Sequence, residues 1–389
     1  MIVGCPVCQS AAAFIIEQRA PVPVLMNRLY PSADAARNAP AGRLDMRCCR
    51  DCGFAWNAAF DPALIVYDAA YENDQSHSPA FAAHIRARTE DVIAAAPSGQ
   101  PLDLLEIGCG QGGFIGEVAA FAGQRMRSAE GFDPAWRGKS GEGPNGSRIH
   151  TVYFTSETAH LMRHQPNVIV SRHTIEHVPD PVAFLKAVRA ALGQASRARI
   201  FIETPSITWI LEHKAMQDLF YEHCSIFTPE ALTYALAVSG FAPVRVDQVF
   251  GGQYLWAQAQ AVESVAVEKP RGAGRGDLKG ASERFVAQWR EAGRSARRDG
   301  RVAVWGAGAK GVTFCGLVDP AAVLVDHVID INPAKQGKHL AGSGIQVLSP
   351  QTASLRAPKT IFVMNPNYLE EIRQQATSVG IDAKFVAID

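Results

Sequence analysis

The sequence lacks the features that would direct it to a membrane or to nucleic acid. No apolar run reaches the roughly 18 residues of a membrane-spanning helix, and the opening residues, MIVGCPVCQS, lack the layout of a signal peptide. Lysine and arginine (38) balance aspartate and glutamate (38), and no basic run with interleaved aromatics offers a surface for phosphates. We therefore expect a cytoplasmic protein with neither a nucleic-acid nor a membrane partner.

Cysteine is also scarce, with 8 residues in a chain of 389, which is too few for a disulfide scaffold. Four of them form two C-x2-C pairs, Cys5 with Cys8 and Cys49 with Cys52. Such pairs supply four thiolates for tetrahedral Zn²⁺, and four protein ligands leave no open position for a substrate. We expect a structural zinc site that stabilises a segment with little core of its own.

Cys48 competes with Cys49 for the role of metal ligand. The x2 spacing and Gly53, which suits a tight turn after the second cysteine, favour Cys49. Four buried cysteines without a metal are the alternative.

The length of 389 residues is too great for one ordinary core. Between 263 and 299 the composition shifts to Lys, Arg, Gly and Glu, which predicts a linker with one exposed amphipathic helix. We divide the chain into an N-terminal zinc-binding module (1–78), a central α/β domain (79–262), the linker and its helix (263–299) and a C-terminal α/β domain (300–389).

The central domain is organised around a strand, a glycine-rich turn and a helix. The apolar run Leu104–Ile107 predicts a buried parallel strand, and residues 108–113, GCGQGG, turn it into a helix from Phe114. A second apolar stretch ends at Asp133, where an acid can accept hydrogen bonds from ribose hydroxyls. This unit predicts a site for an adenosine-containing cofactor, with a tight turn that binds nothing as the alternative.

An acid precedes the glycines, in the order E-x-G-C-G-x-G, whereas a dinucleotide uses G-x-G-x-x-G. Glu106 would repel a phosphate but could hold a cationic amino acid moiety. The stretch resembles motif I of class I S-adenosylmethionine (SAM) methyltransferases. The resemblance implies that the glycines line the methionine end of SAM and that Asp133 takes its ribose, so the SAM-binding residues we expect here are Glu106, Gly108, Cys109, Gly110, Gly112 and Asp133.

The remaining strands of this sheet are predicted at 152–154, 167–171 and 198–203, with a closing pair within 241–259. His173 and His177 follow the strand at 167–171, and ligands bind beyond the carboxyl ends of strands in open α/β sheets. Histidines that cap or pack are the alternative. Glu222 and His223 place an acid beside a base, and histidine is the default proton acceptor near neutral pH. A solvated pair is the alternative there.

The last part has a second glycine turn. A strand at 302–305 is followed by residues 306–311, GAGAKG, and Asp330 ends the next strand. Read alone, this is half of an NAD site, but about eighty residues allow only one small sheet, with strands at Val302, Val328, Thr360 and Phe385. The lysine in the turn suits a phosphate of some other nucleotide.

Together these motifs resemble the three-domain C-methyltransferases that act on nucleotide-diphosphate-linked deoxyketosugars. The likeness rests on the two C-x2-C pairs, EIGCGQGG, ETPS…DLFYEHCSIFTP and VWGAGAKG…DINPAKQGKHLAGSGIQVLSP, in that order. It implies an α/β protein with a class I SAM methyltransferase Rossmann-like core, an N-terminal zinc module and a small C-terminal Rossmann-like domain. It also implies a sugar nucleotide, and no NAD chemistry, at Gly306, Gly308, Lys310, Gly311, Asp330 and Lys335.

The family's catalytic Glu-His pair matches Glu222 and His223, and its histidine after the fourth strand matches His177. His223 would remove a proton α to the ketone, Glu222 would orient the imidazole, and His177 would hydrogen-bond the enolate oxygen. The enolate carbon would then attack the methyl group of SAM.

The chain departs from the family at two tyrosines. Phe220 occupies the position of a family tyrosine, so we add the adjacent Tyr221 to the catalytic residues. Tyr71 is present in the N-terminal loop, but Asn73 replaces a second tyrosine. We count Tyr71 and His173 among the SAM-binding residues.

Three other functions compete with sugar C-methylation, and we expect a monomer or weak homo-oligomer in each case. The first is O- or N-methylation of another small metabolite, and the second is an NAD-dependent oxidoreductase or nucleotide-binding module that uses GAGAKG. The third is a zinc-ribbon adaptor with a degenerate enzyme fold that acts on RNA. The absence of net positive charge argues against binding to RNA.

Overall fold

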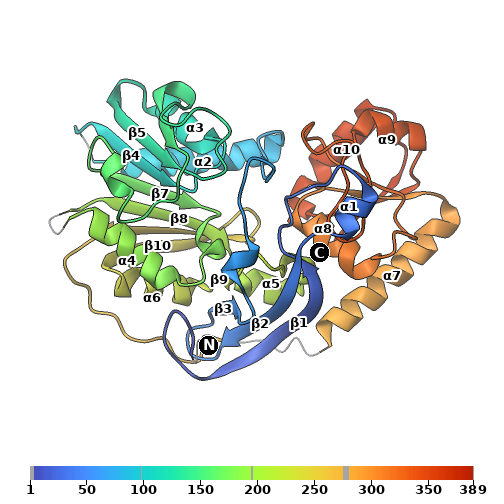
Figure 1. The fold of residues 1–389 in the computed structure, drawn as a ribbon, viewed down its shortest axis with the longest axis horizontal. Helices are drawn as coiled ribbons and strands as arrows, with labels where there is room; N and C mark the ends of the chain where they lie inside the picture. The colour runs from blue at the N-terminus through green and yellow to red at the C-terminus, as the bar shows by residue number, and fades with distance from the viewer. Residues whose placement is uncertain (1–3, 98, 194–195, 275–279, 389) are drawn as a thin grey trace.

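The computed structural model describes residues 4–97, 99–193, 196–274 and 280–388. It contains three sheets, two of which form the cores of domains that lie side by side (Figure 1). The long strands β1 (Ala13–Pro23) and β2 (Ala41–Cys49) run across the base between these domains. Within the described residues, no helix is both long and apolar enough to cross a membrane.

The central domain is a seven-stranded sheet in the order β10-β11-β8-β7-β4-β5-β6. Its five inner and edge strands β4 to β8 are parallel, and β10 and β11 close one side as an antiparallel pair. The strands are β4 (Leu102–Ile107), β5 (Met126–Phe132), β6 (Arg148–His150), β7 (Val168–Arg172), β8 (Arg199–Pro205), β10 (Phe241–Val249) and β11 (Tyr254–Ala261). The helices are α2 (Pro79–Ala95), α3 (Gly113–Ala122), α4 (Pro181–Ala191), α5 (Ile207–His213) and α6 (Pro229–Val238).

Both faces of this sheet are covered, which explains its continuous apolar strands. Leu104 packs with α2 and α3 on one face, whereas Leu105 packs with α4 and α6 on the other. Strands buried on both faces need apolar residues at successive positions rather than alternate ones.

One predicted strand is wrong. We expected a strand at 152–154, but β6 ends at His150. Ile149 is fully buried, whereas Val152 and Tyr153 are 37% and 58% exposed. The edge strand β6 therefore pairs with β5 only around Ile149, whose side chain reaches the core. Residues 152–154, which are more apolar, lie outside the sheet.

The N-terminal sheet takes a strand from the central part of the chain. Its order is β1-β2-β3-β9, with β3 at Ala55–Asn57 and β9 at Ser225–Ile226, and the short helix α1 (Ala33–Arg37) connects β1 to β2. β9 begins two residues after His223. The N-terminal module is thus joined by backbone hydrogen bonds to the segment that carries the predicted acid and base.

The C-terminal sheet is fully parallel, in the order β14-β13-β12-β15-β16. The strand β14 was not predicted, because two residues carry no periodic signal. The strands are β12 (Val302–Trp305), β13 (His327–Ile329), β14 (Val347–Leu348), β15 (Thr360–Val363) and β16 (Lys384–Ala387). The helices are α7 (Ala281–Asp299), α8 (Ala309–Val318), α9 (Pro350–Arg356) and α10 (Leu369–Ser378).

The helix α7 is the one that we expected to be exposed in the linker. Phe285 and Trp289 are buried and contact the rings of Phe314 and Phe362, so α7 packs on the core of the C-terminal domain. Its opposite face carries the charges that suggested a linker. Residues 275–279 of the predicted linker lie outside the described residues.

A histidine in this domain makes its stability sensitive to acid. His327 in β13 is 1% exposed, and neither ring nitrogen has a hydrogen-bond partner among the described residues. Burial lowers its pKa from 6.5 to about 4. Between these pH values the unfolded chain binds a proton that the folded chain does not, so stability is lost as the pH falls through this window.

We expect His327→Phe to reduce the loss of unfolding free energy between pH 6.5 and pH 4 by about 2 kcal/mol. Urea unfolding at a series of pH values measures this difference. His160→Gln, at an exposed histidine, is the control and should leave the pH dependence unchanged. Parallel curves for wild type and His327→Phe would contradict the assignment.

Candidate active site

A cavity of about 270 Å³ lies between the central and C-terminal domains. Parallel strands of both sheets end there, at the edge where open α/β sheets bind ligands. The central domain contributes His173, His177 and His223, and Tyr71 comes from the loop before α2. The C-terminal domain contributes all six predicted substrate-binding residues, which are Gly306, Gly308, Lys310, Gly311, Asp330 and Lys335.

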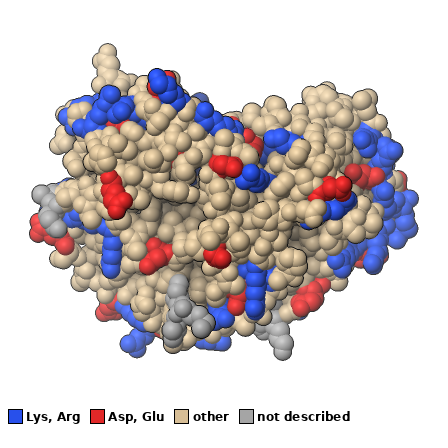
Figure 2. Space-filling view, in the orientation of Figure 1, with Lys and Arg blue, Asp and Glu red and all other residues tan. Residues whose placement is uncertain are grey.

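In Figure 2, basic side chains gather along the right edge of the molecule and at the upper left, and acidic and basic side chains alternate over the rest of this face.

His223 has the properties of an unprotonated base. Its ring is half-buried and packs on the ring of Phe220, with the two ring centroids 4.0 Å apart. The ring centroid of His177 lies 4.9 Å away. Burial lowers the pKa of His223 well below 6.5, and the neighbouring His177, His173 and Lys310 lower it further. Nδ1 has no hydrogen-bond partner among the described residues. The imidazole is therefore neutral at pH 7 and has a free ring nitrogen.

Glu222 does not orient His223 as we expected. Its carboxylate accepts hydrogen bonds from the backbone N–H of Met26 and from the hydroxyl of Tyr71, both at 2.8 Å. The hydroxyl of Tyr67 lies 3.4 Å from the same oxygen as that of Tyr71. These partners lie in the N-terminal part of the chain, so Glu222 anchors the tyrosine loop while His223 lines the cavity.

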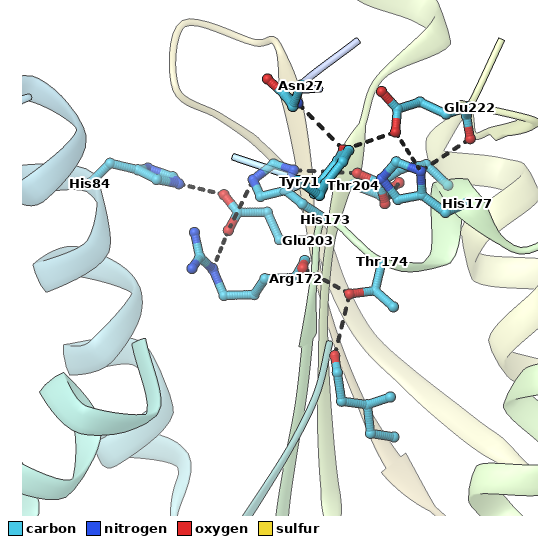
Figure 3. A network of polar contacts seen from close by, with 12 residues as sticks. Asn27, Tyr71, His84, Arg172, His173, Thr174, His177, Glu203, Thr204 and Glu222 are labelled. Carbon is cyan, nitrogen blue, oxygen red and sulfur yellow. Dashed lines mark hydrogen bonds and ion pairs between the residues drawn. The ribbon is translucent and has the colours of Figure 1, made fainter. Parts of the chain in front are cut away.

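Tyr67 is a site residue that the sequence did not reveal. Its hydroxyl is 2.8 Å from Nδ1 of His177, and Figure 3 shows the chain of contacts from Asn27 through Tyr71 and Glu222 to His177. Burial and the charge of Glu222 raise the pKa values of Tyr67 and Tyr71 well above 10. Both phenols therefore remain hydrogen-bond donors. The spacing of Tyr67 and Tyr71 in YDAAY was the signal available.

Tyr221 lies outside the cavity, contrary to our expectation. Its hydroxyl accepts a 2.8 Å hydrogen bond from the backbone of Asp61, and its ring packs on Phe60. Phe220 lines the cavity in its place. The tyrosine of this chain stands one residue later than the family tyrosine. Its hydroxyl therefore bonds the backbone of Asp61 and does not reach the cavity.

A second buried network, also missed, lies beneath His173 (Figure 3). Glu203 accepts a hydrogen bond of 2.5 Å from Nε of Arg172 and contacts the ring of His84. Burial would raise the pKa of Glu203, but Arg172, His84 and His173 outweigh it and lower the pKa. His173 itself has a φ of 49°, a strained conformation that occurs at functional sites.

The four glycines of the central turn have different physical roles. A Cβ at Gly108 would lie 1.9 Å from the hydroxyl of Thr174, and one at Gly112 would lie 2.7 Å from Ile149. These two positions need glycine for packing. A Cβ at Gly110 or Gly113 would meet no heavy atom of the described residues within 4 Å, so these two positions face open space.

Asp133 fixes this turn. Its carboxylate accepts hydrogen bonds from the backbone of Gly110 at 2.7 Å and of Ala135 at 2.8 Å. Cys109 is buried against Gly131. The motif residues Glu106, Gly108, Cys109, Gly110, Gly112 and Asp133 do not border the cavity between the domains, whereas His173 and Tyr71 do.

The charge state of Glu106 differs from our expectation of an ionised carboxylate. It is 2% exposed, and Oε2 has no hydrogen-bond partner among the residues described. Burial raises its pKa to about 8, although Arg172 opposes the shift. The carboxyl group is therefore largely protonated at pH 7 and has one free oxygen.

Four cysteine sulfurs converge in the N-terminal module, from Cys5, Cys8, Cys49 and Cys52. Sγ of Cys5 is 3.6 Å from that of Cys52, and Sγ of Cys8 is 3.5 Å from that of Cys49. Tetrahedral Zn²⁺ with Zn–S bonds of 2.3 Å holds its sulfurs about 3.8 Å apart. The donor set therefore fits zinc. Cys48 points away, toward the carbonyls of Cys49 and Gly53.

Glu176 is a further missed residue. Its carboxylate, His177 and His223 have ligand atoms within 4.8 Å of one another. These are donor types that also suit divalent transition metals. Its neighbour Thr204 donates a 3.2 Å hydrogen bond to one carboxylate oxygen.

Two protein-family models match the chain. A methyltransferase domain matches residues 75–246, and a C-methyltransferase C-terminal domain matches residues 282–388. A relative, the C-methyltransferase NovU of Streptomyces niveus, is 28% identical over 292 residues, which make up 69% of this chain and 67% of that protein.

Solved methyltransferase structures are similar to part of the chain. The 1,6-didemethyltoxoflavin-N1-methyltransferase of Burkholderia thailandensis is 17% identical, with a TM-score of 0.35 over 46% of this chain and 79% of its own. The magnesium protoporphyrin IX methyltransferase ChlM of Synechocystis PCC 6803 is 14% identical, with a TM-score of 0.37 over 49% and 90%. At these scores neither structure bears on substrate or mechanism.

The family models and the seven-stranded sheet confirm the predicted class I methyltransferase core. The second model, a C-methyltransferase C-terminal domain, matches the last domain of the chain. The chain is therefore a SAM-dependent methyltransferase that is similar to the C-methyltransferases.

Proposed function

We propose that this enzyme methylates a carbon of a nucleotide-diphosphate-linked deoxyketosugar through an enolate that His223 forms. The observation that carries the proposal is the position of a neutral, half-buried imidazole in a cavity whose opposite wall is a nucleotide-type glycine turn. A proton α to a ketone is weakly acidic, so the base must act together with a donor to the developing oxyanion.

His177 can supply that donor. Nδ1 of His177 lies 2.8 Å from the hydroxyl of Tyr67 and 3.1 Å from the backbone carbonyl of Glu222. In the tautomer that accepts from Tyr67, whose phenol remains protonated, the ring proton is on Nε2. An Nε2–H then hydrogen-bonds the enolate oxygen as charge develops. The pair His223 and His177 would thus divide the work of base and oxyanion donor.

SAM supplies an electrophilic methyl group. The residues that would hold it are those of the central turn, because Gly110 leaves space for a ligand and Asp133 presents a carboxylate at the end of β5. The free oxygen of Glu106 would accept a hydrogen bond from the methionine end.

Lys335, rather than Lys310, is the better candidate for the diphosphate. Nζ of Lys310 pairs with Asp218 at 2.7 Å and with Gln253 at 3.3 Å, which offsets its charge. Nζ of Lys335 has the carbonyl of Ala307 at 3.4 Å, and no described carboxylate forms an ion pair with it. A buried, uncompensated ammonium at a glycine turn attracts a phosphate.

We expect Lys335→Met to weaken the binding of a nucleoside diphosphate by about tenfold to a hundredfold, because a charge-assisted hydrogen bond of roughly 1.5–3 kcal/mol is lost. SAM affinity should not change. Calorimetry with dTDP and UDP measures the effect, and Lys338→Met, in the same loop, is the matched control. Equal affinities for wild type and Lys335→Met would remove this residue from the site.

Two experiments test the proposed function. In D₂O with a candidate ketosugar nucleotide and S-adenosylhomocysteine (SAH), the α carbon should take up deuterium, since the enolate forms without methyl transfer. An O- or N-methyltransferase would methylate its substrate when SAM is supplied, but it would show no deuterium uptake at carbon in the presence of SAH. Calorimetry with SAM and with NADH distinguishes the methyltransferase from an NAD-dependent oxidoreductase. Tight binding of NADH without binding of SAM would establish the oxidoreductase.

The proposal includes structural zinc at the four cysteines, a cytoplasmic location and a monomeric or weakly oligomeric enzyme. The domain limits 1–78 and 79–262 are part of it. The predicted linker 263–299 is shortened at its end, because α7 packs on the C-terminal domain and is assigned to it together with residues 300–389.

A further inference from the structure

Residues 67–78, here called the strap, border the cavity and contact both domains. Tyr67 and Tyr71 reach Glu222 and His177 in the catalytic region. Tyr71, Asn73, Asp74, Gln75, His77 and Ser78 line the cavity, whereas the side chain of Glu72 does not and is 4% exposed. Glu72 therefore lies within the wall, between the strap and the two domains.

The carboxylate of Glu72 is shared between the two domains. Oε2 forms an ion pair of 2.7 Å with Arg137 of the central domain. Oε1 accepts a hydrogen bond of 3.1 Å from the side-chain amide of Asn332 in the C-terminal domain. The backbone N–H of Glu72 donates to the carbonyl of Asn27, which fixes the residue itself.

Each partner of Glu72 belongs to a ligand-binding loop. Arg137 lies four residues after Asp133, its backbone N–H donates to Gln111 in the central glycine turn, and its guanidinium also holds the carbonyls of Ala69 and Tyr71. On the other side, the backbone of Asn332 donates at 2.8 Å to Asp330.

Asp330 in turn accepts a hydrogen bond of 2.7 Å from Ala307 in the second glycine turn. The strap has further bonds to the C-terminal domain, from Ser78 to Glu371 and from Tyr368 to Gln75. A continuous path of charge-assisted and neutral hydrogen bonds therefore connects the two glycine turns, and Glu72 is the residue at which the two halves meet.

We propose that Glu72 is a positioning residue that couples the SAM site to the nucleotide site by ordering the strap and its tyrosines. The inference rests on the proposed function. A ligand at either site that holds Arg137 or Asn332 in place orders one half of the strap, so the second ligand meets a strap that is already ordered. The coupling is then positive, and its factor is the same whichever ligand binds first.

The strap also gives the coupling a catalytic consequence. Tyr71 and Tyr67 reach the catalytic region from the same segment, so the hydrogen bond from Tyr67 to His177 depends on the order of the strap. A loosened strap would lower kcat without changing the chemistry of His223.

The experiment measures SAH affinity by calorimetry with and without saturating dTDP, and dTDP affinity with and without SAH. In the wild type we expect each ligand to tighten the other by about tenfold. Glu72→Gln removes the charge that pairs with Arg137 and should reduce the factor to below about twofold, with each affinity measured alone nearly unchanged. Arg137→Gln should do the same, and the double variant should be no worse than either single one.

Asp68→Asn is the matched control, because it removes a carboxylate from the same strap whose partners are Arg28 of the N-terminal module, at 3.1 Å, and the backbone N–H of Ala70. It should keep the wild-type coupling factor. If the wild type binds dTDP and SAH independently, or if Glu72→Gln keeps the coupling, the inference is overturned while the proposed function stands. If the wild type binds neither dTDP nor UDP, the nucleotide site fails and the coupling fails with it.

Discussion

Replacing His223 with alanine is expected to lower kcat by about a thousandfold, the middle of the range for loss of a general base. SAM affinity should change by less than twofold, because His223 lies in the cavity between the domains and the central glycine turn does not border it. Deuterium uptake at the α carbon in the presence of SAH should fall by the same factor as kcat, since both depend on enolate formation. Rapid-quench kinetics and exchange measured by NMR provide these two values.

The pH profile gives an independent check on His223. Its pKa lies well below 6.5 because of burial and of the neighbouring His177, His173 and Lys310, so the neutral base persists on the acid side of neutrality. The kcat attributable to this residue should therefore stay constant between pH 8 and pH 6.5 and decline only below that range. A decline centred at pH 6.5 or above, or retained exchange in His223→Ala, would move the role of base to another group.

The second large effect concerns the four cysteines. Cys49→Ser should release one equivalent of zinc and unfold the N-terminal module, because zinc binding contributes on the order of 10 kcal/mol to the folding of small zinc modules. Metal analysis after dialysis and differential scanning calorimetry measure the two consequences.

Cys48→Ser is the matched control for Cys49→Ser. The Cys48 thiol points to the carbonyls of Cys49 and Gly53, outside the cluster. A serine hydroxyl can bond the same carbonyls, so we expect a cost of about 1 kcal/mol and full zinc content. Loss of zinc from the Cys48 variant but not from the Cys49 variant would show that Cys48, and not Cys49, is the zinc ligand.

Both glycine turns could be predicted from the sequence because the signal is local. A buried strand, glycines and an acid at a fixed offset specify a strand–turn–helix unit in almost any context. The local motif predicts where the turn lies in the chain, but it does not predict which residues the turn packs against. Glycine at Gly108 and Gly112 meets packing demands from Thr174 and Ile149, residues far away in the sequence.

The direction of Glu222 could not be predicted in the same way. The pair Glu222 and His223 reads as a unit in the sequence, but only His223 lines the cavity. The partners of Glu222 are Met26 and Tyr71, about 200 and 150 residues earlier in the chain. Long-range pairing also explains why β9 and Tyr67 were missed, since neither has a periodic pattern of its own.

The pairing of β9 with β3 sets a condition for building chimeras of this enzyme. The hydroxyl of Thr228 bonds the carbonyl of Cys52, and β9 lies between that contact and His223. The cysteine cluster and the proposed base, His223, are therefore joined through one short stretch of backbone. A chimera that exchanges the N-terminal module would have to include residues 223–228, because β9 belongs to the N-terminal sheet.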